Sequence, residues 1–148
     1  MLKPKKILVP TDFSEYSDKA LQQGIDIARH YNSTVYLYHV IQFELRHIVV
    51  DYAIPIEVID AVEKEQVSAA MENMKKQLAR CSETEDVKVA MEVGKGVAYE
   101  EILSKEKEKG IDLIVIASLG STGLAKYIVG SVSRNVLKNA VCPVLLTK

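Results

Sequence analysis

The stretch Asp112-Leu-Ile-Val-Ile-Ala-Ser118 decides the fold class, because five apolar residues in a row stand between its polar ends. A strand with one face in water alternates apolar and polar residues, whereas a strand covered on both faces does not. We therefore predict a buried strand over residues 112–118, as in a parallel sheet that helices cover on both sides. A glycine- and serine-rich segment, which runs from Ala117 to Val132, follows this strand directly.

Outward from this strand, the chain alternates strand and helix patterns. Short runs rich in β-branched and aromatic residues predict four more strands, at residues 6–10, 34–41, 87–93 and 143–147. Apolar residues at helical spacing predict helices after a serine cap at Ser14 or Ser17 and over residues 55–80, 97–109 and 129–140. Residues 42–54 show no clear period, and we expect an irregular or partly helical connection there.

Five strands that alternate with four helices predict an α/β fold, a single doubly wound five-stranded parallel sheet with helices on both faces. Right-handed crossovers place the loops after the strands at one edge of the sheet, where such folds bind ligands. Pro143 marks the last strand as an edge strand or as a place where no ladder donor is needed. Because no linker or repeat interrupts the pattern, we expect one domain over residues 1–148.

Composition excludes several classes of protein. The 148 residues carry a net charge of -1, whereas non-specific nucleic-acid binding normally needs a basic face. No apolar stretch approaches the roughly 20 residues of a membrane span, and the first residues lack the pattern of a signal peptide. Cys81 and Cys142 form no metal or disulfide framework. We therefore expect a cytoplasmic protein with two reduced thiols, with no nucleic-acid or membrane partner.

The segment after the buried strand has the residues of an anion site. Glycine lets backbone amides turn toward a phosphate, and Gly120, Gly123 and Gly130 all occur in this segment. Gly130 and Ser131 precede a predicted helix, whose unpaired first amides and dipole favour an anion. Spacing alone leaves two interpretations open: a phosphate site, or a glycine-rich turn with a serine cap and no ligand.

Polar residues at the ends of the first two strands have a similar ambiguity. Asp12 ends the first strand, where a carboxylate can meet a sugar hydroxyl or a metal, or can cap the following helix. His39 is expected to be a sheet residue with its own hydrogen bond. Tyr36 and Tyr38 share one face of their strand and are expected to pack in the core.

Several motifs in order make the chain similar to the universal stress protein family, ATP-binding branch, over nearly its whole length. That branch carries a small residue, two spacers, glycine, nine spacers, then glycine and Ser/Thr. The present sequence matches with Ala117, Gly120 and Gly130-Ser131. The opening Ile7-Leu-Val-Pro-Thr-Asp-Phe-Ser14 and the closing Cys142-Pro-Val-Leu-Leu146 resemble the family as well. Ala117 replaces the usual glycine, and Leu119 replaces the usual histidine.

The resemblance implies an adenine nucleotide alpha hydrolase-like fold that binds ATP, or AMP or ADP, with Mg²⁺ held through the phosphates near Asp12. It implies that the adenine lies by the first strand end and the Val40 backbone, the ribose by Asp12 and Ala117, and the phosphates by the glycines and the last helix. The implied nucleotide-binding residues are Pro10, Thr11, Asp12, Val40, Ala117, Gly120, Gly130, Ser131 and Val132. It also implies a homodimer through the last strand, Val141 to Thr147. Because a bound nucleotide would change the conformation of nearby loops, we further expect a regulatory protein partner of unknown identity that reads this change.

Other nucleotide-binding motifs do not occur in the sequence. There is no Gly-x4-Gly-Lys-Ser/Thr loop, and Pro10-Thr-Asp-Phe-Ser14 stands where a dinucleotide fold would carry Gly-x-Gly-x-x-Gly. We therefore expect a nucleotide-binding regulatory or stress-response sensor. Two alternatives are a slow ATP hydrolase or phosphoryl-transfer enzyme, and an interaction module that binds no ligand.

Overall fold

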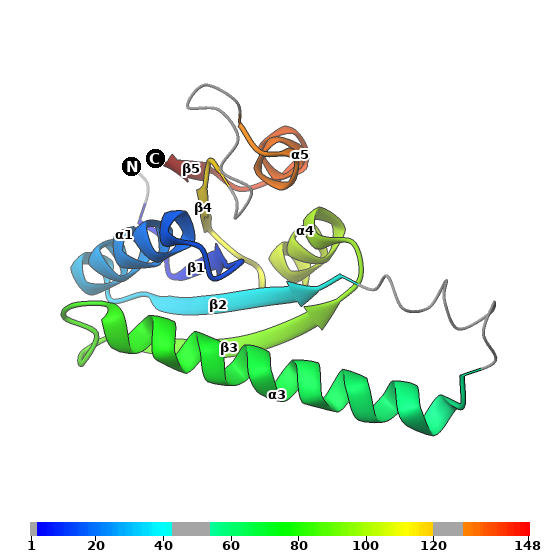
Figure 1. The fold of residues 1–148 in the computed structure, drawn as a ribbon. Helices are drawn as coiled ribbons and strands as arrows, with labels where there is room; N and C mark the ends of the chain where they lie inside the picture. The colour runs from blue at the N-terminus through cyan, green and yellow to red at the C-terminus, as the bar shows by residue number, and fades with distance from the viewer. Residues whose placement is uncertain (1–2, 43–53, 120–128) are drawn as a thin grey trace.

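Five parallel strands form the sheet at the centre of the part of the chain that the structure describes, in the order β3-β2-β1-β4-β5 (Figure 1). The computed structural model describes residues 3–42, 54–119 and 129–148. The strands are β1 (Lys6–Pro10), β2 (Thr34–Ile41), β3 (Lys88–Lys95), β4 (Leu113–Ala117) and β5 (Val144–Thr147). The predicted five-stranded parallel sheet is confirmed.

Helices follow the strands as the sequence predicts. They are α1 (Glu15–Tyr31), α3 (Ile56–Arg80), α4 (Ala98–Lys109) and α5 (Ser131–Asn139). Ser14, not Ser17, caps α1, because its side-chain oxygen accepts a hydrogen bond from the Ser17 amide at 3.2 Å. Gly110 ends α4 in the left-handed conformation at φ 61°, as its position predicts. None of the helices within the described ranges is long and apolar enough to cross a membrane.

Alternate residues of β1 point into two separate cores. Ile7 and Val9 pack on one face of the sheet with α1 and with Met74 of α3. Leu8 packs on the other face with Ile102 of α4 and with α5. Complete burial of such side chains stabilises the fold by about 1.5–3 kcal/mol each. The two cores confirm that helices cover both faces of the sheet.

Two element boundaries differ from the sequence prediction by more than one residue. Strand β3 continues through Gly94 to Lys95, although the glycines at 94 and 96 suggested an end at residue 93. The Tyr38 side chain of the neighbouring strand occupies the space that a Cβ at position 94 would need, so this glycine belongs inside the strand. Helix α5 begins at Ser131 rather than at residue 129, because Gly130 has the extended conformation of an N-cap, with φ -58° and ψ 157°.

Strand β5 lies at the edge of the sheet, as Pro143 predicts. A buried carboxylate fixes the turn before it: Glu106 of α4, only 4% exposed, accepts hydrogen bonds from the Val141 and Cys142 amides at 2.8 and 2.7 Å. The start of β5 is therefore held by a helix that packs on the sheet and not by neighbouring strands alone.

The order of the strands creates a switch point at β1. Ile7 of β1 pairs with Val35 of β2 on one side and with Leu113 of β4 on the other. From β1 the chain therefore continues to one side through β2 and β3, and the C-terminal strands lie on the other side. Loops diverge at such a switch point, which leaves a crevice at the carboxyl ends of the strands.

Candidate functional site

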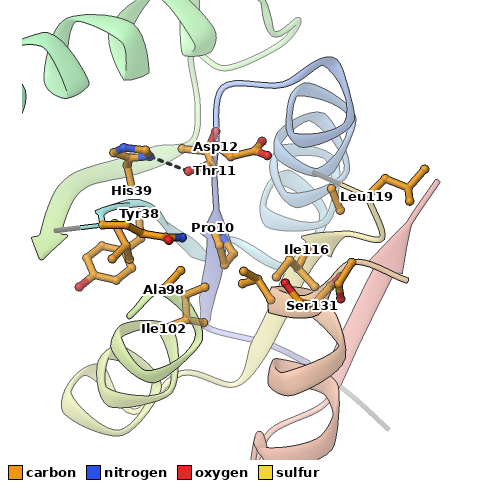
Figure 2. Close-up of a pocket in the computed structure, with 16 residues that line it drawn as sticks. Pro10, Thr11, Asp12, Tyr38, His39, Ala98, Ile102, Ile116, Leu119 and Ser131 are labelled. Carbon is orange, nitrogen blue, oxygen red and sulfur yellow. Dashed lines mark hydrogen bonds between the residues drawn. The ribbon is translucent and has the colours of Figure 1, made fainter. Parts of the chain in front are cut away.

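A cavity of about 340 Å³ opens at the carboxyl ends of the central strands, between α4 and the start of α5 (Figure 2). Its volume lies in the range of small-molecule sites. All of the predicted nucleotide-binding residues that the structure describes line this cavity: Pro10, Thr11, Asp12, Val40, Ala117, Gly130, Ser131 and Val132. Gly120 lies outside the described residues, as do Gly123 and His47. Three segments far apart in the sequence thus meet at one site, although their part in binding stays a prediction.

The turn after β1 is held at several points. The Thr11 amide donates to the Tyr38 carbonyl at 2.9 Å. The Thr11 carbonyl lies 2.8 Å from His39 Nδ1, and because a carbonyl only accepts, Nδ1 carries the proton. The predicted hydrogen bond of His39 is therefore confirmed. Phe13 follows with the unusual φ of 65°, and its ring lies 4.4 Å from the His39 ring. These contacts fix the backbone on both sides of Asp12.

The Asp12 carboxylate is at the cavity wall but also has a local role. Its Oδ1 accepts hydrogen bonds from the Ser14 amide at 3.1 Å and from the Ser14 hydroxyl at 2.6 Å. Ser14 in turn caps α1, so Asp12 orients the cap residue without being the cap itself. The alternative that Asp12 itself caps the helix is therefore wrong, because Ser14 holds that position. Asp12 supports the start of the helix through Ser14, and it lines the cavity.

The start of α5 forms the opposite wall. The N-cap of this helix is Gly130, which has no side chain that could accept from the amides of the first turn. The Gly130 amide donates to the Ser118 carbonyl at 2.7 Å, which ties the helix start to the end of β4. The Ser133 hydroxyl donates to the same carbonyl at 3.2 Å. The first-turn amides and the helix dipole at Ser131 and Val132 favour an anion at this wall.

The third wall of the cavity comes from α4, and the sequence analysis did not predict it. Ala98 and Ile102 line the cavity one helical turn apart. Their only signal in the sequence is their place after β3, since the loops after parallel strands share one edge. Other lining residues outside the predicted binding set are Tyr38, His39, Gln42, Ile116, Leu119 and Ser133.

Tyr38 has two roles where the sequence predicted one. It packs in the core at 3% exposure, as expected, and it also lines the cavity. Its hydroxyl donates to Glu101 at 3.3 Å, and the Lys105 ammonium lies 5.1 Å from the ring centre. Burial, followed by the nearby Glu101 charge, raises the pKa of Tyr38 to about 12. The phenol therefore stays neutral at physiological pH and presents an uncharged aromatic wall.

The chemistry of the lining suits a ligand with both apolar and anionic parts. Tyr38, Ile102 and Ile116 are apolar, whereas the α5 start offers backbone donors. Over residues 3–42, 54–119 and 129–148, no group of three His, Cys, Asp or Glu side chains is arranged to hold a metal ion. Cys81 and Cys142 are both free thiols, as predicted.

Comparison with known proteins identifies relatives along nearly the whole chain. A family model described as the universal stress protein family matches residues 3–148. Universal stress protein MJ0531 of Methanocaldococcus jannaschii is 35% identical over 144 residues, which cover 97% of this chain and 82% of that protein. Universal stress protein MJ0577 of the same organism is 35% identical over 159 residues, which cover 97% of this chain and 94% of that protein.

Solved structures give the same result. The structure of MJ0577 matches with a TM-score of 0.77 at 32% identity and covers 100% of this chain and 97% of its own. A universal stress protein in complex with cAMP matches with a TM-score of 0.65 at 17% identity, covering 99% of this chain and 98% of its own. The universal stress protein of Archaeoglobus fulgidus in complex with dAMP matches with a TM-score of 0.60 at 20% identity, covering all of both chains. At those lower identities the likeness shows the fold alone.

Proposed function

The chain belongs to the universal stress protein family, and from that premise we propose that its cavity binds an adenine nucleotide. One observation carries the proposal: residues from the β1 turn, from β2 and from the start of α5, all expected at a nucleotide, line the same cavity. The two family members solved with cAMP and dAMP make an adenine nucleotide the first ligand to test.

The walls of the cavity suggest how the nucleotide lies. The adenine packs near Pro10 and the Val40 backbone, and Tyr38 and Ile102 add apolar surface around it. The ribose lies between Asp12 and Ala117, where a carboxylate can accept from sugar hydroxyls. The phosphates lie at Gly130, Ser131 and Val132, where first-turn amides donate to them. Asp12 would hold Mg²⁺ through the phosphates of ATP or ADP.

The proposed role is that of a regulatory or stress-response sensor in the cytoplasm. The bound nucleotide changes the surface that a protein partner reads. Gly120 is assigned to the phosphates by its place in the motif alone, since it lies outside the described residues.

Binding is tested by calorimetry on protein stripped of nucleotide by unfolding and refolding. AMP, ADP and ATP, the last two with and without Mg²⁺, should each be titrated to about 1 mM, which detects even weak affinity. Absence of both heat and a thermal shift would refute the proposal. Mass spectrometry of the nucleotide after overnight incubation separates binding from hydrolysis, because a sensor returns the nucleotide intact.

We also propose a homodimer through the segment Val141 to Thr147. Strand β5 is an edge strand, and apolar side chains of this segment are solvent-accessible: Val141 is 84% exposed and Leu145 is 36% exposed. A bare apolar edge is an aggregation hazard, and pairing two such edges removes it. Light scattering should give twice the chain mass, and Val141→Asp should shift the protein toward monomer. A monomeric wild type at high concentration would contradict this proposal.

A further inference from the structure

A buried glutamine on α3 is hydrogen-bonded to the turn that carries Asp12. The Gln77 side chain is 1% exposed, and its Oε1 accepts a hydrogen bond from the Thr11 hydroxyl at 2.8 Å. Its Nε2 donates to Ser17 Oγ at 3.2 Å and to Asp18 Oδ1 at 2.7 Å. One amide group thus joins α3, the first turn of α1 and the end of β1.

Asp18 determines which way this amide points. A carboxylate only accepts hydrogen bonds, so the NH₂ group of Gln77 has to face it. The Arg80 guanidinium holds the carboxylate in place, because its Nη2 lies 2.9 and 3.0 Å from the two Asp18 oxygens. The carbonyl oxygen of Gln77 is therefore left facing Thr11.

The Thr11 hydroxyl has two acceptors in reach, and Gln77 Oε1 at 2.8 Å is the nearer, with Ser17 Oγ at 3.1 Å. Thr11 has one hydroxyl proton, and when Gln77 accepts it, the Thr11 oxygen is free to accept from the Phe13 amide at 3.0 Å. Phe13 has φ 65°, which residues with a side chain rarely adopt and which persists only where the surroundings hold it. Asp12 lies between these two residues, so its direction depends on both.

We infer that Gln77 is a positioning residue of the cavity. Gln77 does not itself line the cavity. Through Thr11 and Phe13, it holds the turn in the one conformation that presents Asp12 to the ligand. The functional meaning of this inference rests on the proposed nucleotide site, whereas the conformation of the turn can be measured without any ligand. Preorganisation of this kind increases affinity because the ligand does not have to order the turn when it binds.

The test uses Gln77→Met, which has a similar length and makes none of these hydrogen bonds. Hydrogen exchange of the Phe13 amide, measured in the nucleotide-free protein, should become about tenfold faster, which is the loss of one hydrogen bond of ordinary strength. The dissociation constants for AMP and for Mg-ATP should rise about tenfold, because the same turn must then be ordered on binding.

Three further variants separate positioning from general stability. Met74→Ala removes a fully buried side chain from the same helix and no hydrogen bond from the turn. It should lower thermal stability and leave the exchange of Phe13 and both dissociation constants within about twofold of wild type. The double variant Thr11→Val with Gln77→Met should bind no more weakly than Thr11→Val alone, because both changes break one pathway.

Two results would overturn the inference. The first is that the Phe13 amide exchanges at the wild-type rate in Gln77→Met. The second is that Met74→Ala changes the exchange of Phe13 and the two dissociation constants as much as Gln77→Met does. If the wild-type protein binds neither AMP nor Mg-ATP, the proposed function fails, and the exchange of Phe13 alone decides whether Gln77 positions the turn.

Discussion

A Cβ atom on Gly94 would lie 1.9 Å from the hydroxyl oxygen of Tyr38 and 2.6 Å from its Cζ. Tyr38 of β2 therefore leans across β3 and fills a space that only glycine leaves open. The same tyrosine lines the cavity. Gly94 does not line the cavity, yet it sets the position of the Tyr38 ring that does.

Gly94→Ala should move Tyr38 and destabilise the protein. Forcing an extra methyl group into a packed region costs about 1–3 kcal/mol, and urea unfolding followed by circular dichroism measures it. Nucleotide affinity should fall as well, because the ring is pushed toward the cavity. Gly110→Ala is the matched control: its Cβ meets nothing within 4 Å, so only its φ of 61° opposes the change. It should cost about 1 kcal/mol and leave affinity unchanged. Equal affinities in both variants would contradict the role of Gly94.

Gly130→Asp should separate binding from folding. Position 130 is the N-cap of α5 and has a conformation open to any residue, and aspartate is a preferred cap. Stability should therefore be unchanged or rise by a few tenths of a kcal/mol. The new carboxylate faces the proposed phosphates, and its repulsion should weaken binding of ATP at least tenfold, or about 1.4 kcal/mol. Gly130→Asn has the same shape without the charge and should bind better than the aspartate variant. Comparable dissociation constants for the two variants would show that no anion binds there.

Glu106→Ala should be among the most destabilising changes on α4. It leaves the partly buried Val141 and Cys142 amides without their acceptor, at a cost of about 2–4 kcal/mol in urea unfolding. Glu106→Gln keeps an acceptor oxygen and should cost less. Glu108→Ala removes an exposed partner of Lys105 from the same helix and should cost less than about 1 kcal/mol. If Glu106→Ala and Glu108→Ala lower the free energy of unfolding by similar amounts, the Val141 and Cys142 amides form hydrogen bonds with water instead.

Stability should decline in alkaline solution because of Cys142. Burial, followed by hydrogen bonding and charge from Glu106, raises the pKa of the Cys142 thiol from 9.0 to about 12. The unfolded chain ionises this thiol first, so its contribution to stability is complete below pH 9.0 and is lost as the pH rises through about 12. One group changes the free energy of unfolding by at most about 1.4 kcal/mol per pH unit, and by less here because the thiol is partly exposed.

The measurement is urea unfolding from about pH 8 to about pH 10, below the range where Tyr38 adds its own effect. Cys142→Ala should decline less steeply than wild type. Burial also raises the pKa of Cys81, so Cys81→Ala gives a second comparison and the double variant should have the flattest profile. Parallel profiles for wild type and Cys142→Ala would contradict the prediction.

The sequence predicts those parts of the site that come from local patterns. The apolar run that ends at Ala117 places the end of β4, and Gly130-Ser131 places a helix start, because strand burial and helix capping act over a few residues. Asp12 follows β1 for the same reason. These features needed no knowledge of what packs against them.

The remaining features depend on packing between distant segments. Ala98 and Ile102 line the cavity only because α4 lies beside β1 and β2, and no local pattern says which face of a helix meets a ligand. Gly94 resembles a strand end until Tyr38 is known to need its space. In the sequence, Gln77 looks like any surface glutamine of a helix, because its partner Thr11 lies on a different element.

The central place of β1 also has a consequence for how the protein is made. Ile7 pairs with Val35 early in the sequence and with Leu113 late in it. During synthesis β1 gains its first neighbour soon, yet its other edge stays bare until β4 has left the ribosome. The cavity, whose walls come from both ends of the chain, is therefore among the last features to form. A truncated product would expose that bare edge, which chaperones and proteases recognise, before it had any site for a nucleotide.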